Sequence, residues 1–261
     1  MTEKRPPSVA PRRHFLLRAA GAAGALMLAG CNRLSQSEWF PKVLAVGEKA
    51  SDAAAHVAVP RRSMAQEFAE SDRSPTFRAN GTSDPDSEAY RALASTGFAD
   101  YRLEVVGLVE RPLSLSLAEL RALPARTQIT RHDCVEGWSA IAKWKGAKLA
   151  ALLEAAKPTA AARYLVFHCA DPMSADASDK YYESIDLEDA RHPQTILAYE
   201  MNDAALPVAN GAPIRLRVER QLGYKHAKYV MRIELVESFA KIAGGNGGYW
   251  EDQGYQWFAG I

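Results

Sequence analysis

One cysteine in the middle of the chain lies among residues that could make it reactive. Cys134 follows Arg131, His132 and Asp133 and precedes the run 135–138, Val-Glu-Gly-Trp. Nearby cations favour the thiolate, the form of cysteine that attacks substrates and binds soft metals. A lone cysteine is also often a small buried apolar side chain. The segment therefore offers a metal ligand, a nucleophile or a core residue, with Arg131 and His132 placed to orient a polar or anionic substrate.

Two later segments combine glycine with cations. The first is the run 210–215, Asn-Gly-Ala-Pro-Ile-Arg, and the second is the run 223–228, Gly-Tyr-Lys-His-Ala-Lys. Glycine lets a ligand approach the backbone closely, and lysine supplies a point charge, so the second run suits phosphate or another compact anion. A solvated basic turn would have the same composition, and the residues alone leave both interpretations open.

Strands are needed to position these segments, and the hydrophobic alternation predicts several. They are expected at 101–109, 128–131, 164–168, 214–219 and 229–236. The strand at 214–219 has one charged face, because its apolar residues alternate with arginine and glutamate. The runs 195–201 and 206–207 flank Asn202 and Asp203, which predicts a hairpin.

Two short helices complete the prediction. Ser116 and Glu119 have the spacing of a capping box and predict a helix that ends before Pro124. The run 147–156 predicts a second helix, with three leucines on one face: Leu149, Leu152 and Leu153. The expected fold class is α+β, a single strand-rich mixed domain with short helices. The aromatic run 244–261 is expected to form an ordered, irregular cap.

Composition excludes several classes of protein. The 261 residues are 48% hydrophobic and 24% charged, which excludes a wholly disordered or fibrous chain. Outside residues 1–30, 27 basic and 30 acidic residues remain, so bulk charge predicts no nucleic-acid partner. Three cysteines cannot make a disulfide framework, and no histidine or cysteine spacing is typical of zinc.

The first thirty residues predict export. Arg12 and Arg13 precede an apolar run at 19–30 that is about half the ~20 residues a membrane span needs. This pattern resembles a twin-arginine signal, which carries folded proteins to the periplasm. Cys31 ends a Leu-Ala-Gly-Cys run that resembles a lipoprotein cleavage box and predicts a lipid anchor. The expected division is a signal with lipobox at 1–31, a tether and extended segment at 32–75, and the folded domain at 76–261.

The segments around Cys134, Asn210 and Gly223, in this order and at these separations, resemble the molybdenum-binding domain of the sulfite oxidase family. The resemblance covers roughly residues 75–237 and is strongest to the bacterial periplasmic branch of methionine-sulfoxide reductases. It implies a mononuclear molybdenum held by molybdopterin and by the thiolate of Cys134. Cys169 is then expected to be a small buried residue, because a cysteine that binds metal cannot also form a disulfide.

The resemblance also implies roles for residues around the cofactor. Asn210 and Arg215 would contact the pterin and its phosphate. The anion cradle would consist of Gly223, Lys225, His226 and Lys228. The segment that closes over the pterin would include Phe77, Arg78 and Asn80. His168 lies near the position of a polar residue that contacts the cofactor.

The implied activity is oxygen-atom transfer at molybdenum. The substrate would be a sulfoxide or N-oxide, including oxidised methionine, or a small oxyanion. Val135 and Glu136 after the cysteine, and Asn210 at the turn, differ from the sulfite oxidase pattern and favour the reductase branch. Electrons would be exchanged with a separate membrane haem protein or cytochrome. Two alternatives remain: a non-catalytic lipoprotein that keeps the fold as a binding module, and a thiol enzyme with His132 as the base for Cys134.

Overall fold

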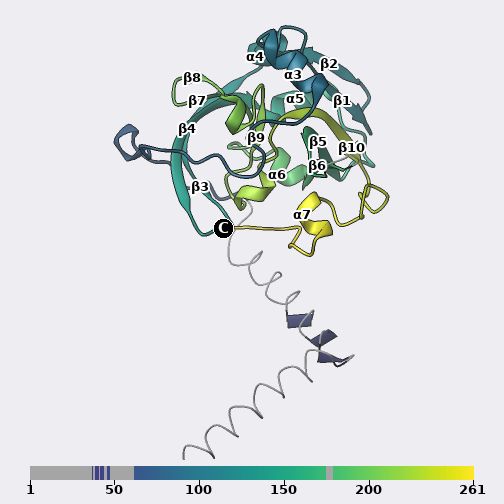
Figure 1. Cartoon of the computed structure of the whole chain (residues 1–261). Helices are drawn as coiled ribbons and strands as arrows, with labels where there is room; N and C mark the ends of the chain where they lie inside the picture. Colours follow the sequence, from purple (N-terminus) through teal and green to yellow (C-terminus); the bar gives the residue numbers. More distant parts are fainter. Residues whose placement is uncertain (1–36, 38, 41, 44–45, 48–61, 175–178) are drawn as a thin grey trace, which may run out of the picture. The chain divides into compact units, whose positions relative to one another are not determined.

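The computed structural model describes residues 37, 39–40, 42–43, 46–47, 62–174 and 179–261. Residues 61–261 form one compact unit (Figure 1). The predicted twin-arginine signal and Cys31 lie outside the described residues. Within the described ranges, no helix has both the length and the apolar character needed to cross a bilayer.

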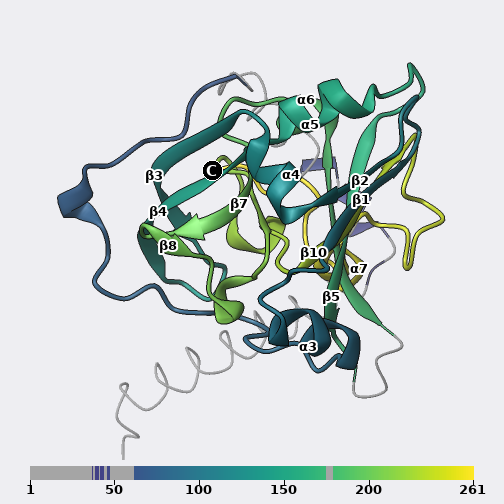
Figure 2. The ribbon, with the colours of Figure 1, turned by 90° about the horizontal axis from the view of Figure 1, so that it is seen from above.

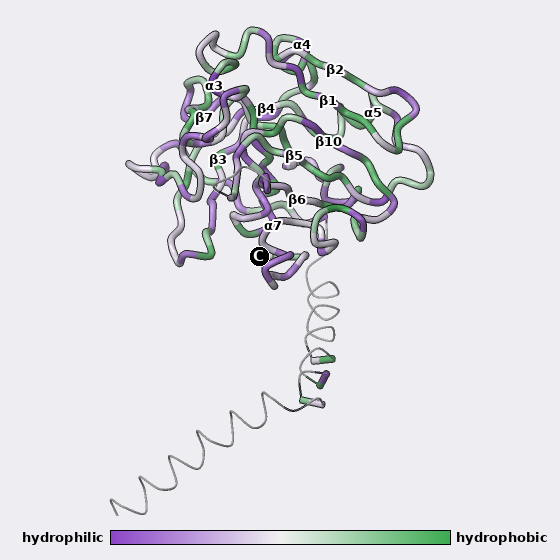
Figure 3. Tube along the Cα trace, turned by 45° about the vertical axis from the view of Figure 1, so that its right-hand side comes forward, coloured by the Kyte–Doolittle hydropathy of each residue, from purple (hydrophilic) through white to green (hydrophobic). Residues whose placement is uncertain are grey.

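The first sheet has five strands and carries most of the core. In spatial order they are β2 (Leu113–Ser116), β1 (Arg102–Gly107), β10 (Val230–Val236), β5 (Tyr164–Pro172) and β6 (Lys180–Asp186). Strands β1 and β10 run parallel, and the other neighbours are antiparallel. Figure 3 shows hydrophobic stretches along β1, β5 and β10.

The second sheet is antiparallel and carries the residues of greatest chemical interest. Its strands are β3 (Ala125–Asp133), β4 (Ser139–Lys148), β7 (Ile196–Met201) and β8 (Ala204–Ala205), with β9 (Arg215–Arg217) paired to β7. Figure 2 shows β3, β4, β7 and β8 as a group apart from β1, β2, β5 and β10.

Short helices connect and cover the strands. The helices are α3 (Glu88–Ser95), α4 (Leu117–Ala122), α5 (Leu149–Ala156), α6 (Leu187–Ala190) and α7 (Tyr249–Asp252). Three 3-10 turns are η1 (Glu70–Asp72), η2 (Val208–Asn210) and η3 (Gly223–Lys225). The N-cap of α4 is Ser116 in a capping box with Glu119, which confirms the predicted helix start.

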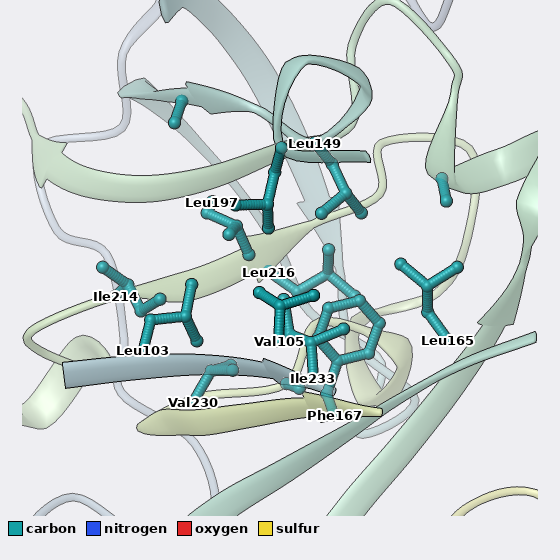
Figure 4. Packing of buried hydrophobic residues seen from close by; sticks show 14 of the residues in the cluster. Leu103, Val105, Leu149, Leu165, Phe167, Leu197, Ile214, Leu216, Val230 and Ile233 are labelled. Atoms are coloured by element: carbon teal, nitrogen blue, oxygen red, sulfur yellow. The ribbon is translucent and has the colours of Figure 1, made fainter. Parts of the chain in front are cut away.

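One apolar cluster joins the two sheets and α5. It contains Leu103 and Phe167 from the first sheet, Leu197 and Leu216 from the second, and Leu149 from α5 (Figure 4). All five are fully buried. Each such side chain stabilises the fold by about 1.5–3 kcal/mol. The α+β prediction and the buried leucine face of the second helix are both confirmed.

Two predictions about strands need correction. The hairpin after β7 turns at Asn202 and Asp203 as expected, but its second strand is β8 and not 206–207. Both turn residues have positive φ, so the chain reverses in two residues and pairing resumes at once. The predicted strand at 214–219 shrinks to β9, and all three of its residues are buried, including Arg215 and Arg217.

Candidate active site

A cavity of about 180 Å³ collects residues that are far apart in the chain. Six of the predicted site residues line it: Asn80, Cys134, Arg215, Gly223, His226 and Lys228. They come from the loop before α3, the end of β3, the strand β9 and the segment 223–228. The two sheets and the connecting loops therefore assemble just under half of the thirteen predicted site residues in one place.

Cys134 lies in a tight turn directly after β3. Its backbone N–H donates to the carbonyl of Trp138 at 2.9 Å, and Gly137, with φ +85°, allows the turn. The Sγ atom accepts a hydrogen bond from Nδ2 of Asn80 at 3.5 Å. Burial raises the pKa of the thiol, and this outweighs the Asn80 bond and the charge of Arg78. The expectation that its neighbours make Cys134 a thiolate is therefore wrong for the protein alone.

Arg131 and His132 point to opposite faces of β3, as successive residues of a strand must. Arg131 is exposed and forms an ion pair with Asp133, Nε to Oδ1, at 2.8 Å. His132 is buried, and its Nδ1 accepts a hydrogen bond from Nη1 of Arg217 at 3.0 Å. Burial and the charge of Arg217 lower the pKa of His132 well below its usual value. Neither residue lines the cavity, and the two described side chains Cys134 and His132 share no hydrogen bond.

Arg215 and Lys228 are buried cations beside the cavity. Nη1 of Arg215 donates to the carbonyl of Asn210 at 3.0 Å, and Nζ of Lys228 donates to the carbonyls of Asn80, at 2.8 Å, and Thr82. Burial lowers the pKa of Arg215 to about 9 and that of Lys228 to about 8. In the described part of the chain neither cation has a carboxylate within ion-pair distance. This wall of the cavity therefore carries positive charge that no carboxylate of the described residues pairs.

Several buried polar atoms around this wall also lack a partner among the described residues. They are Nε2 of His132, Nδ2 of Asn210, Nε of Arg215 and Nδ1 of His226. The rings of His132 and His226 lie 5.1 Å apart, and Arg215 and His226 both line the cavity. An unpartnered buried polar group costs about 1–3 kcal/mol, so Nε of Arg215 and Nδ1 of His226, whose residues line the cavity, favour a ligand that bonds to them there.

Gly223 allows close packing at the same wall. A Cβ atom at this position would lie 2.6 Å from Nε2 of His132, so any larger residue would displace the histidine. The carbonyl of Gly223 accepts from the backbone N–H of His226 at 3.1 Å, which fixes the turn. The glycine is therefore required for the packing of this wall.

Lys225 differs from the prediction that placed it in the anion cradle. Its side chain is fully buried and forms ion pairs with Glu183 of β6 and with Glu251 of α7, the latter at 2.6 Å. It does not line the cavity. Two carboxylates from distant elements already bind its ammonium, so it is not available to an anion in the cavity.

The remaining predicted residues lie near the cavity or away from it. His168 is half-buried on β5, where Nε2 bonds to Glu234 at 2.9 Å, and it does not line the cavity. Phe77 packs against the ring of His132, with centroids 5.6 Å apart. Arg78 acts on the site through its charge, which offsets a small part of the rise that burial causes in the pKa of Cys134.

Other cavity residues were not predicted for the site. They are Gly81, Thr82, Val135, Glu136, Asp171, Met173, Tyr181, Tyr224, Trp250 and Tyr255. Asp171 is buried, its Oδ1 has no hydrogen-bond partner among the described residues, and burial raises its pKa to about 6. Trp250 and Tyr255 belong to the aromatic run 244–261, whose composition predicted an ordered cap but no contact with the site.

A family model described as an oxidoreductase molybdopterin-binding domain matches residues 92–241. A putative protein-methionine-sulfoxide reductase subunit, YedZ1, from Azospira oryzae is 44% identical over 162 residues, 62% of this chain and 56% of that protein. The protein-methionine-sulfoxide reductase catalytic subunit MsrP from Campylobacter jejuni is 34% identical over 151 residues, 54% of this chain and 51% of that protein. MsrP from Xanthomonas campestris is 35% identical over 161 residues, 59% of this chain and 50% of that protein.

The chain thus spans about half the length of the curated relatives it matches. Among solved structures, the sulfane dehydrogenase SoxCD from Paracoccus pantotrophus aligns with a TM-score of 0.48 and 24% identity. That alignment covers 54% of this chain and 39% of the SoxCD chain.

Proposed function

The chain belongs to the family of oxidoreductase molybdopterin-binding domains, and from this membership we propose that it is a molybdenum enzyme that reduces sulfoxides. Membership confirms the resemblance that the three sequence motifs predict. The proposal goes further and assigns the metal, the residues that hold the cofactor and the substrate.

The cavity fits a molybdopterin in charge and in hydrogen-bonding capacity. Molybdopterin carries a phosphate, and the cationic wall of Arg215 and Lys228 offers two charges that no carboxylate of the described chain pairs. Nε of Arg215 in the cavity lining, and Nδ2 of Asn210 on the residue whose carbonyl bonds to Arg215, are donors without a partner among the described residues, and a bound pterin phosphate would satisfy them. We assign Asn210, Arg215, His226 and Lys228 to the cofactor, and we leave Lys225 and His168 out of this set.

Cys134 would be the protein's own ligand to the metal. The described residues contain no group of three or more His, Cys, Asp or Glu side chains that could hold a metal ion, so a metal at Cys134 needs its other ligands from a bound organic group. A dithiolene supplies them. Metal binding also removes the thiol proton, which offsets the raised pKa that burial gives Cys134.

When bound, the cofactor supplies two-electron transfer of an oxygen atom. The net reaction R₂SO + 2H⁺ + 2e⁻ → R₂S + H₂O requires two protons, and Asp171 can deliver one of them, with the other taken from solvent. Asp171 lines the cavity, and a pKa of about 6 leaves part of its Oδ1 and Oδ2 protonated near neutral pH. Nδ2 of Asn80 lies beside Sγ of Cys134 and can donate to the substrate's oxygen.

Several finer assignments belong to this proposal. The relatives named as protein-methionine-sulfoxide reductases support oxidised methionine as the substrate. The sequence of residues 1–31 supports export to the periplasm by the twin-arginine route, with lipid at Cys31. Electrons would come from a membrane haem protein or a cytochrome.

The observation that carries the proposal is the group of unpartnered buried polar atoms beside two unpaired cations. The test is metal and pterin analysis of full-length protein made in cells with an intact cofactor pathway. We expect about one molybdenum per wild-type chain, loss of metal and sulfoxide reduction in Cys134→Ser, and retention of both in Cys169→Ala, which changes the other buried free cysteine. Folded wild-type protein without metal or pterin would refute the proposal.

A further inference from the structure

The C-terminal segment, residues 244–261, forms part of the cavity although it lies beyond residue 241, where the family match ends. Trp250 of α7 and Tyr255 both line the same cavity as Cys134. Figure 1 shows α7 beside β6, at the end of the unit where the chain terminates. We call the pair Trp250 and Tyr255 the aromatic wall.

Buried polar contacts hold this segment in place. Glu251 pairs with Lys225, and Nε1 of Trp257 donates to Oγ of Ser184 at 2.8 Å. The hydroxyl of Tyr224 donates to the carbonyl of Gln256 at 2.6 Å. These contacts tie the segment to β6 and to the loop that also carries His226 and Lys228. The aromatic wall is therefore fixed relative to the cationic wall.

Part of the aromatic wall is open to the cavity. Tyr255 is 41% exposed although its ring packs 5.4 Å from that of Trp250 and 5.3 Å from that of Tyr224, and both Trp250 and Tyr255 line the cavity. Val135, the residue after the cysteine, is also exposed and lines the cavity together with Met173. Apolar side chains gathered at the mouth of a charged cavity mark a place where a partly apolar molecule binds.

We propose that the aromatic wall is the substrate-specificity subsite, which binds the hydrocarbon groups on either side of the sulfoxide; this rests on the function proposed above. A methionine sulfoxide carries a methyl and a methylene next to sulfur, and aromatic faces attract such groups and sulfur itself. A compact oxyanion such as sulfite has no apolar group to place there. The wall therefore selects sulfoxides of apolar side chains over small anions.

Lys225 acts in this arrangement as a positioning residue. It holds α7 through Glu251 and sits two residues after Gly223 in the loop that borders the cofactor cavity. Its burial and its two carboxylate partners explain why it is absent from the cavity itself. The two walls are thus joined by one buried ion cluster, which consists of Lys225, Glu183 and Glu251.

The test compares two substrates of different size on molybdenum-loaded enzyme. We expect Trp250→Ala and Tyr255→Ala each to lower kcat/KM about tenfold to 100-fold for a peptide with one methionine sulfoxide, mainly through KM. For dimethyl sulfoxide, which is too small to reach across the aromatic wall, kcat/KM should change by less than about threefold. Trp250→Phe keeps an aromatic face, so its kcat/KM for the peptide should lie between the values of wild type and Trp250→Ala.

Two controls separate specificity from stability and from loading. Trp257→Phe removes the bond to Ser184 in the same segment but leaves the cavity lining intact, so it should not change the ratio of the two substrates. Calorimetric binding of the sulfoxide peptide to metal-free protein should weaken in Trp250→Ala by a similar factor. This second measurement does not depend on the metal.

The outcomes distinguish the two proposals. If loaded wild type reduces neither sulfoxide, the proposed function fails and the subsite fails with it. If wild type reduces both and Trp250→Ala lowers both equally, or neither, only the subsite is overturned. A selective loss for the peptide, with weaker peptide binding, supports both.

Discussion

Lys225 and Lys228 are both buried and lie three residues apart, but they have different partners. Lys225 is linked to the aromatic wall, and Lys228 belongs to the cationic wall. Lys225 is neutralised by Glu183 and Glu251 and holds the C-terminal segment. Among the described residues, Lys228 bonds to backbone carbonyls and has no carboxylate within ion-pair distance. The comparison indicates that a paired buried cation serves the fold, and it supports the proposal that an unpaired one beside a cavity serves a ligand.

The largest effect should follow from removing the paired lysine. Lys225→Met would leave two buried carboxylates without a cation, and breaking such a cluster costs about 3–5 kcal/mol. Burial already raises the pKa of Glu183, and loss of Lys225 raises it further. Because a carboxyl with a raised folded pKa loses stability as pH rises through that pKa, the destabilisation should be smaller at pH 5 than at pH 8.

Chemical denaturation of cofactor-free Lys225→Met and wild type at both pH values measures this effect. Lys241→Met, which changes an exposed lysine near the first sheet, is the control and should change stability by less than about 0.5 kcal/mol. A Lys225→Met variant as stable as wild type at pH 8 would remove the distinction between the two lysines.

Removing an unpaired cation should affect cofactor binding strongly and stability little, the opposite of the result expected for Lys225. Burial and the charge of Arg217 lower the pKa of Arg215, so its charge does not stabilise the cofactor-free fold. We expect Arg215→Met to change the free energy of unfolding by about 1 kcal/mol or less. Its pterin content should fall at least about tenfold, since each charge-assisted bond to phosphate contributes about 1.5–3 kcal/mol.

Pterin fluorescence after oxidation and thermal denaturation, applied to the same preparations, check this pair of outcomes. Arg215→Lys keeps the charge and should retain part of the pterin. Strong destabilisation of Arg215→Met with normal pterin content would show that Arg215 serves the fold and not the ligand.

The sequence predicts much of the site because local patterns place its main residues. Cys134, Arg215 and Lys228 were identified by residue type and spacing, and the cavity brings them together. The start of α4 follows from Ser116 and Glu119, three residues apart. Such patterns involve residues only a few positions apart, so they can be identified from a single sequence.

The rest depends on contacts between distant residues. Nothing local distinguishes Lys225 from Lys228; the difference comes from Glu183 and Glu251, which lie 42 and 26 residues away. Strand β4 was not predicted, because small alanines on one face and lysines on the other leave Ile141 and Trp144 as its large hydrophobic residues, too few for a clear alternation. Strand β4 forms because it pairs with β3 on one side and β7 on the other, and this pairing is not visible in its own sequence.

The pH dependence of anion binding and of stability should distinguish Lys228 from the paired Lys225, with a smaller effect. The pKa of Lys228 is lowered to about 8, so its ammonium loses most of its charge between pH 7.5 and 9.5. Affinity of metal-free protein for inorganic pyrophosphate should fall about tenfold over this range. Because the unfolded chain keeps this proton to higher pH, the fold should gain stability relative to Lys228→Met between pH 8 and 9.5.

Titration calorimetry and denaturation across this range measure the two opposite slopes. Lys228→Arg should flatten the loss of affinity, since arginine keeps its proton. Parallel slopes, or affinity that does not change with pH, would mean that Lys228 does not face the anion.

The smallest effect concerns the two carboxylates that share Lys225. Burial raises the pKa of Glu183 well above its usual value, so the fold disfavours its ionised form. Glutamine keeps the shape of glutamate and removes the charge, so Glu183→Gln should cost less than about 1 kcal/mol, whereas Glu251→Gln, which removes the carboxylate that ties α7 to Lys225, should cost more. Denaturation of both variants decides between them. If Glu251→Gln were the milder change, Glu183 of β6 would contribute more than Glu251 of α7 to holding Lys225.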